Sequence, residues 1–260
     1  MLFANSDDDA RILETKKDGR IYIPASRLDT INTMDAVIVP SGEVKIQLRS
    51  LGVKIPIFVI AAAVDVRVLN ELKDSKNDLF RRYFRIGSEQ KYAMSVMHVR
   101  DRKEIEEMNM LASAVPDVNF YVFVSASKTL SDRIRLKTFD KFTAKNLIVT
   151  GLIPEDVYRS GLIDASYFID LGSEKMSVMT IYEPMYAKVP LIISKKAVIS
   201  DIVDPKRAFL VKDYNGAAFV IRNNLSSEEN VANAFEYTKN VNKENFTAAI
   251  FNLFQKIYSR

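Results

Sequence analysis

The sequence contains no cysteine. That absence excludes disulfides, thiolate metal sites and cysteine catalysis, and it fits a cytoplasmic protein. No uninterrupted apolar run approaches the ~20 residues that a membrane-spanning helix needs. The first residues include a run of acids where a signal peptide would have a basic flank, so we expect no secretion. Nothing in the sequence predicts a metal site or a cofactor.

A large excess of one charge is also absent. The 37 basic residues exceed the 33 acidic ones only slightly, and they are spread along the chain, which does not favour nucleic-acid binding. One local cluster, Leu79–Gly87, interleaves Arg81, Arg82 and Arg85 with aromatic residues. Two interpretations stay open: contact with an anionic membrane surface, or a solvated helix face beside an apolar stripe.

What the sequence does have is a core and a regular pattern. With 260 residues, of which 48% are hydrophobic, the chain can bury ample apolar surface. Short apolar strands alternate with helices, which predicts an α/β fold with a doubly wound parallel sheet from about Lys91 to Asp213. The expected strands of this sheet are 92–98, 119–125, 146–150, 166–171 and 190–194, all central; helices are expected at 102–115, 129–139, 154–164 and 178–188. Ligands of such sheets bind at the carboxyl ends of the strands.

The order of these segments resembles the nucleotide-sugar-binding half of retaining GT-B glycosyltransferases (glycosyl transferases group 1), and particularly the bacterial diacylglycerol glucosyltransferases. The resemblance is carried by "DAVIVPSGEVKIQLRSLGVKIPIFVIAAAVDV", by "LIVTGLIPEDVYRSGLIDASYFIDLG", and by "TIYEPMYAKVPLIIS", which matches the second half of a Glu-x7-Glu motif. It implies that residues 1–68 are a truncated remnant of the first GT-B domain. Residues 69–260 would then be a Rossmann-like nucleotide-sugar domain with C-terminal helices.

The resemblance also implies a donor-binding site. Glu183 would accept hydrogen bonds from ribose hydroxyls, which suits an ionised carboxylate because it is an acceptor only. Thr180, at a helix start, would lie near the diphosphate, and Lys103 would neutralise it. Leu152 and Ile153 would sit by the base. An alternative for Glu183 is a first-turn acid that complements the helix dipole.

Several residues depart from the family pattern. Lys175 replaces the first glutamate of the motif, and Val178 replaces a glycine that approaches the donor sugar. His98, the only histidine, stands where an arginine is expected, and it either meets a phosphate or packs at a strand end. The turns at 125–129 and 60–63 also lack glycine. Glycine has no Cβ and therefore allows the backbone to approach a ligand most closely. These changes indicate a degenerate donor site, although we expect Glu183, Lys103 and His98 to meet at one sheet edge.

Two functions therefore stay open. The first is transfer of a hexose from a nucleotide sugar such as UDP-glucose to an envelope lipid or surface glycoconjugate, at the inner face of the membrane. The second is a non-catalytic partner that stabilises or positions an active glycosyltransferase. Apolar strands within residues 21–60 and the helix Ala248–Tyr258 predict self-association or binding to a partner glycosyltransferase chain. No nucleic-acid partner is expected.

Overall fold

The computed structural model describes residues 2–3, 14–15, 21–75, 78–98, 102–125, 144–151, 153–172, 178–225 and 228–259. Its strands are β1 (Leu2–Phe3), β2 (Glu14–Thr15), β3 (Ile21–Tyr22), β4 (Val37–Val39), β5 (Ile57–Val59), β6 (Tyr92–His98), β7 (Asn119–Ser125), β8 (Leu147–Thr150), β9 (Tyr167–Asp170), β10 (Leu191–Ser194) and β11 (Phe209–Val211). Its helices are α2 (Ala25–Asn32), α3 (Gly42–Ser50), α4 (Val66–Asp74), α5 (Leu79–Phe84), α6 (Arg102–Ala114), α8 (Glu155–Asp164), α9 (Val178–Tyr186), α10 (Tyr214–Arg222), α11 (Glu228–Thr238) and α12 (Lys243–Tyr258).

The larger part of the chain is built on a six-stranded sheet in the order β11-β10-β9-β6-β7-β8. Every strand pair in it is parallel, which confirms the doubly wound α/β fold. The expectation that all predicted strands are central was wrong for β8. This strand lies at one edge of the sheet, because β7 is its only neighbour among the described strands. At the other edge is β11, a short strand that the sequence pattern did not predict. The helix expected at 129–139 lies outside the described residues.

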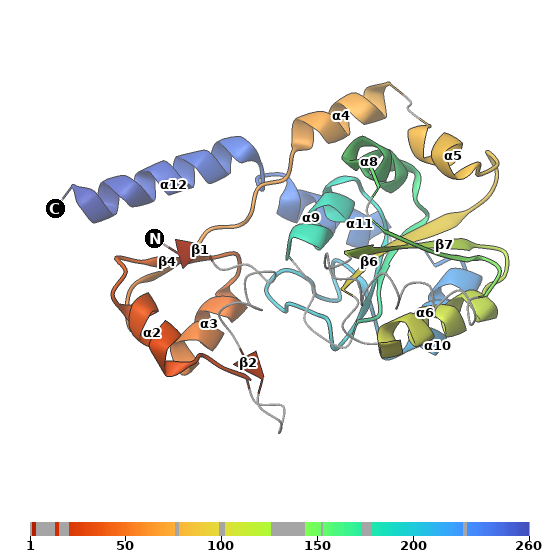
Figure 1. Cartoon of the computed structure of the whole chain (residues 1–260). Coiled ribbons are helices and arrows are strands. Elements are labelled where there is room, and N and C mark those ends of the chain that lie inside the picture. The colour runs from red at the N-terminus through yellow and green to blue at the C-terminus, as the bar shows by residue number, and fades with distance from the viewer. Residues whose placement is uncertain are drawn as a thin grey trace.

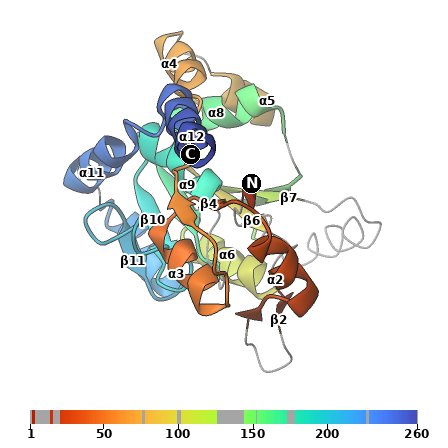
Figure 2. The same cartoon turned by 90° about the vertical axis from the view of Figure 1, so that its left-hand side faces the viewer.

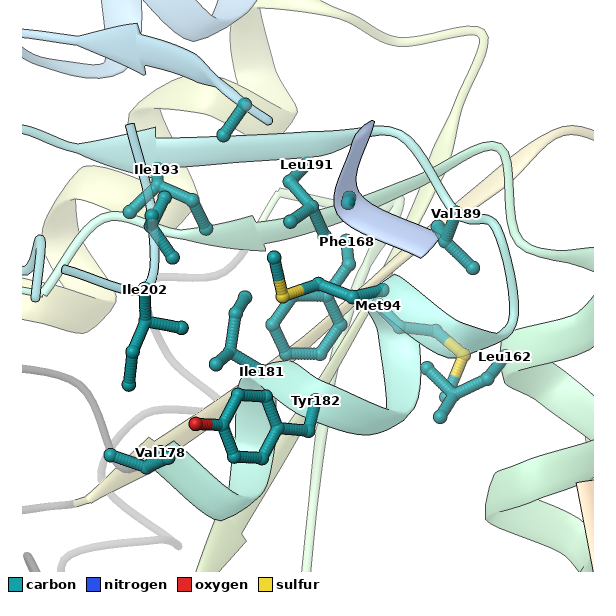
Figure 3. Close-up of a cluster of buried hydrophobic side chains, with 14 of the residues drawn as sticks. Met94, Leu162, Phe168, Val178, Ile181, Tyr182, Val189, Leu191, Ile193 and Ile202 are labelled. Carbon is teal, nitrogen blue, oxygen red and sulfur yellow. The ribbon is translucent and has the colours of Figure 1, made fainter. Parts of the chain in front are cut away.

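Helices cover both faces of this sheet (Figure 1). On one face, α4, α5, α8, α9 and α11 enclose a core that includes Met94, Phe168 and Leu191. On the other face, α6 and α10 pack on the alternate strand residues, such as Ala93 and Ile169. Figure 3 shows the first core, where Tyr182 and its neighbours from α9 lie among strand side chains. Apolar side chains on both faces of each strand explain the nearly continuous hydrophobic runs in the sequence.

The first part of the chain forms a smaller parallel sheet in the order β1-β4-β5. Helices α2 and α3 cover one face with a core that includes Ile31, Val37 and Leu48. The C-terminal helix α12 returns to this sheet, as Figures 1 and 2 show. The hydroxyl of Tyr258 lies 3.0 Å from Asp35 Oδ2, and Lys256 lies over the ring of Phe58 at 5.9 Å from its centroid.

A polar link joins the two sheets at the ends of their strands. The segment that follows β10 carries Asp201, whose Oδ2 accepts the backbone N–H of Gly42 at 2.6 Å, at the start of α3. In return, Glu43 Oε2 accepts the backbone N–H of Ser200 at 2.9 Å. Because α3 follows β4 and the Asp201 segment follows β10, this link holds the carboxyl edges of the two sheets toward each other.

Gly161 makes close packing of α5 on α8 possible, which generates a stability prediction. A Cβ at this position would lie 2.6 Å from Phe80 Cδ2 and 3.0 Å from Met94 Sδ, and Phe80 is fully buried. The clash should outweigh the ~1 kcal/mol of helix propensity that alanine gains over glycine. We expect Gly161→Ala to lower the free energy of unfolding by about 1–2 kcal/mol, measured in urea.

The matched control is Gly151→Ala, because nothing lies within 4 Å of a Cβ there. It should leave stability nearly unchanged. In a Phe80→Leu background, the cost of Gly161→Ala should shrink, since the narrower side chain leaves room for the methyl group. An equal cost in both backgrounds would contradict the packing explanation.

The link between the sheets gives a second prediction. Asp201→Ala removes the side-chain acceptor of the Gly42 N–H, a loss comparable to removing a helix N-cap, at about 0.5–2 kcal/mol. We expect faster hydrogen exchange at the start of α3, measured by mass spectrometry. Asp204→Ala is the control, because Asp204 accepts locally from the backbone of Lys206. Unchanged exchange in α3 on loss of Asp201 would show that the link does not hold the two sheets.

Candidate functional site

The strand order reverses between β6 and β9, which are neighbours in the sheet although α6, β7, β8 and α8 lie between them in the sequence. The chain leaves β6 for α6 on one face and leaves β9 for α9 on the other. Such a reversal opens a crevice at the carboxyl edge, where ligands of doubly wound folds bind. The helix that contains Lys103 and the helix that contains Glu183 therefore cover opposite faces, and residues from them can meet only at this edge.

Glu183 lies in the second turn of α9, which begins at Val178. The interpretation as a first-turn acid was therefore wrong, since the first turn of α9 contains no acid. Pro184 follows within the helix and cannot donate a backbone hydrogen bond to the carbonyl of Thr180. The helix ends soon afterwards, and Lys188 adopts a left-handed φ of 64° just beyond it.

The carboxylate of Glu183 is held by Arg159, which projects from the middle of α8. Arg159 Nε donates to Glu183 Oε1 at 2.9 Å, and a terminal guanidinium nitrogen lies 2.8 Å from the same oxygen. Both side chains are largely buried, with 13% of the Arg159 side chain and 18% of the Glu183 side chain exposed. The same guanidinium nitrogen lies 2.6 Å from Oε1 of Glu155, one turn earlier in α8.

Burial raises the pKa of Glu183 because it disfavours the charged form, and the charge and hydrogen bonds of Arg159 oppose that rise. Glu155 and Asp65 add smaller repulsive contributions to the same pKa. Asp65, the N-cap of α4, is itself ion-paired with Lys243 at the start of α12, and that bond lowers the pKa of Asp65. Glu183 thus lies in a network of alternating charges rather than beside a single counter-ion.

The remaining predicted site residues are only partly described. Thr180 is half-buried in the first turn of α9, and Ile153 packs against the core just before α8. His98 is the last residue of β6, in register with Ser125 of β7, and Lys103 is the second residue of α6. The side chains of His98 and Lys103, and Leu152 as a whole, lie outside the described residues. Their proximity to Glu183 stays a prediction.

Two departures from the family pattern can be compared with the structure. Val178 is 2% exposed and belongs to the same apolar core as Tyr182 and Ile202 (Figure 3). Ala61 and Ala62, from the second glycine-free turn, are half-buried and pack against the same core. The turn at 126–129 and Lys175 lie outside the described residues.

Arg81, in the basic cluster Leu79–Gly87, makes structural contacts within the protein. Arg81 pairs with Asp164, donates to the carbonyl of Gln90 at 3.1 Å, and lies over the ring of Tyr92 at 5.2 Å from its centroid. Arg82 pairs with Asp78 on the helix surface. These contacts favour the interpretation of the cluster as a solvated helix face beside an apolar stripe.

Within the described part of the chain, no helix is long and apolar enough to cross a bilayer.

Sequence reasoning missed Arg159 and Asp201. The spacing of Glu155 and Arg159 is an i,i+4 pair on a predicted helix, so a local ion pair could have been expected. The contact that matters, with Glu183, joins two helices separated by a strand. No periodic pattern reports such a contact, and the same is true of Asp201 and Gly42, which lie 159 residues apart.

Comparison with known proteins finds a distant relative by sequence. No family profile matches the sequence. The processive diacylglycerol alpha-glucosyltransferase of Acholeplasma laidlawii is 25% identical over 186 residues, which span 71% of this chain and 55% of that enzyme. The chain therefore covers about half the length of this curated relative.

Solved structures share the fold. A sucrose-phosphate synthase from Thermosynechococcus elongatus superposes with a TM-score of 0.76 at 15% identity, covering 99% of this chain and 68% of that one. Anabaena HepE, solved in complex with UDP and glucose, superposes with a TM-score of 0.73 at 12% identity, covering 90% of this chain and 68% of that one. By its sequence match the chain is a distant relative of a bacterial diacylglycerol glucosyltransferase, and its fold is the one seen in GT-B glycosyltransferases.

Proposed function

We propose that the chain binds a nucleotide sugar and takes part in transferring its hexose to an envelope lipid or a surface glycoconjugate. The donor is a uridine diphosphate sugar such as UDP-glucose, and the acceptor reaction takes place at the inner face of the membrane. The relationship to a diacylglycerol glucosyltransferase and the fold shared with a protein that binds UDP and glucose support this function.

The observation that carries the proposal is the half-satisfied carboxylate of Glu183. Its Oε1 accepts from Arg159, while its Oε2 has no partner among the described residues. The side chain is 18% exposed, so it is largely buried but still accessible from solvent. A carboxylate in this state can accept a ribose hydroxyl in a charge-assisted hydrogen bond.

The other site residues complete the donor site in this proposal. The first turn of α9, with Thr180, faces the diphosphate with backbone N–H groups and the positive end of the helix dipole. Lys103 and His98 come from α6 and β6, on the other side of the strand-order reversal between β6 and β9. They neutralise the phosphates as the bond to the sugar breaks. Leu152 and Ile153 border the base. The residues 69–260 form the donor domain, and 1–68 contribute a reduced first domain.

A second candidate function is that of a partner subunit which stabilises or positions an active glycosyltransferase. Its support is a row of exposed aromatic side chains on α12, where Phe251 is 60% exposed, Phe254 41% and Tyr258 58%. Phe254 and Tyr258 stack on each other at the surface. An exposed aromatic stripe on a helix that packs against the small sheet is suited to binding another chain.

The donor proposal predicts a loss of binding in Glu183→Gln. The amide keeps the size of the side chain but removes the charge, so the hydrogen bond to a ribose hydroxyl weakens. We expect calorimetry to show an affinity for UDP-glucose that is lower by about tenfold or more. Circular dichroism before titration verifies that the variant is folded.

The matched control is Glu155→Gln, which makes the same change in the other partner of Arg159. The Glu155 side chain is 73% exposed, so this substitution should change affinity little. Equal losses in both variants would mean that Glu183 acts only through the ion-pair network. Absence of UDP-glucose binding by the unaltered protein at millimolar concentration would overturn the donor proposal and favour the partner function.

The partner proposal predicts association that depends on α12. The double substitution Phe251→Ser, Phe254→Ser should convert an oligomer or complex to monomer, measured by light scattering at micromolar protein with and without a co-expressed glycosyltransferase. Phe219→Ser is the control, because Phe219 is 62% exposed on α10, which packs on the six-stranded sheet. An unaltered protein that is monomeric alone and never binds such a chain would contradict the proposal.

A further inference from the structure

The ion pair between Arg159 and Glu183 has a one-sided geometry. Both guanidinium contacts, at 2.9 and 2.8 Å, fall on Oε1 of the glutamate. The terminal nitrogen that contacts Glu183 also lies 2.6 Å from Oε1 of Glu155, whose side chain is 73% exposed. Two contacts from one planar guanidinium to the same oxygen restrict the rotation of the carboxylate, and Oε2 takes no part in the pair.

Arg159 also sets the charge of that carboxylate. Burial raises the pKa of Glu183, and a protonated carboxyl would be a poorer acceptor because one of its oxygens becomes a donor. The groups that face Glu183 are Arg159, Glu155 and Tyr158 from α8 and Asp65 from the start of α4. Arg159 is the one positive group among these, and the charge of Asp65 is balanced by Lys243. Removal of the guanidinium therefore leaves a buried carboxyl surrounded by negative or neutral groups.

We propose that Arg159 is a positioning residue that holds Glu183 as an acceptor for the ribose hydroxyls of a nucleoside diphosphate. This inference rests on the proposed function of Glu183 in donor binding. Arg159 itself acts through the glutamate and does not touch the ligand. It gives the site a preference for ribose over deoxyribose, because only an oriented and charged carboxylate gains from a hydroxyl at that place.

The experiment compares the binding of UDP and 2′-deoxy-UDP by calorimetry at neutral pH. The unaltered protein should prefer UDP by about tenfold, the value of one charge-assisted hydrogen bond. Arg159→Gln should reduce this preference toward one, whereas the surface control Glu155→Gln should retain it. Arg159→Lys keeps the positive charge but loses the planar pair of N–H donors, and it should retain part of the preference for UDP.

A second measurement does not depend on the ligand. A carbon-13 NMR titration follows the carboxyl of Glu183, assigned by its loss in Glu183→Gln. In Arg159→Gln the midpoint should move upward by about 1–3 pH units, and in Arg159→Lys it should stay near that of the unaltered protein. An unmoved midpoint in Arg159→Gln would overturn the charge argument.

The two measurements separate the failures. If the unaltered protein binds neither nucleotide, the proposed donor function is wrong and the ribose role of Arg159 is wrong with it. If UDP binds and the preference survives in a folded Arg159→Gln, the donor function stands and the inference about Arg159 is overturned. If the preference is lost only in Arg159→Gln and the midpoint shifts, both stand.

Discussion

The pairing of β6 with β9 is the constraint on which the rest of the structure depends. Met94 pairs with Phe168 in the middle of the sheet, although a second parallel unit, β7 and β8, lies between the two strands in sequence. Parallel crossovers are right-handed, so a chain that reverses its strand order must change the face on which its helices pack. That change places α8 and α9 on one face and α6 on the other. The candidate site is a consequence of this reversal.

Burial and charge are balanced at the site itself. Arg159 and Glu183 come from neighbouring helices that pack on the core through Val157 and Ile181, so their positions are fixed by apolar contacts. A buried ion pair contributes little net stability because both charges lose hydration. The pair fixes the orientation of the Glu183 carboxylate instead, because Arg159 contacts Oε1 and not Oε2. Asp65 and Lys243 extend the same network to α12, so the charge of the site is connected to the helix that returns to the small sheet.

The small sheet and the six-stranded sheet are related by two kinds of contact. The polar link of Gly42 and Glu43 with the segment after β10 lies at the carboxyl edges, and α12 packs on the small sheet away from that link. The link uses the N-terminus of α3, whose backbone N–H groups and dipole favour a carboxylate. Two separate attachments restrict the angle between the sheets more than either would alone. Tyr258 of α12 takes part in the second attachment through its hydroxyl, whereas the rings of Phe251 and Phe254 stay exposed.

The sequence by itself determined the five strands β6 to β10 and their parallel arrangement, because apolar runs such as "YAMSVMH" and "YFID" are typical of a sheet that is covered on both faces. The fold class was therefore predictable. Glu183 as the candidate acid came from the resemblance of its segment and stays a prediction. The edge position of β8 and the strand β11 were not, since three or four residues carry too little pattern to distinguish an edge from a centre. Only the tertiary structure decided what surrounds Glu183. Arg159 reaches it from the neighbouring helix α8, because long-range pairing depends on how helices pack and not on local periodicity.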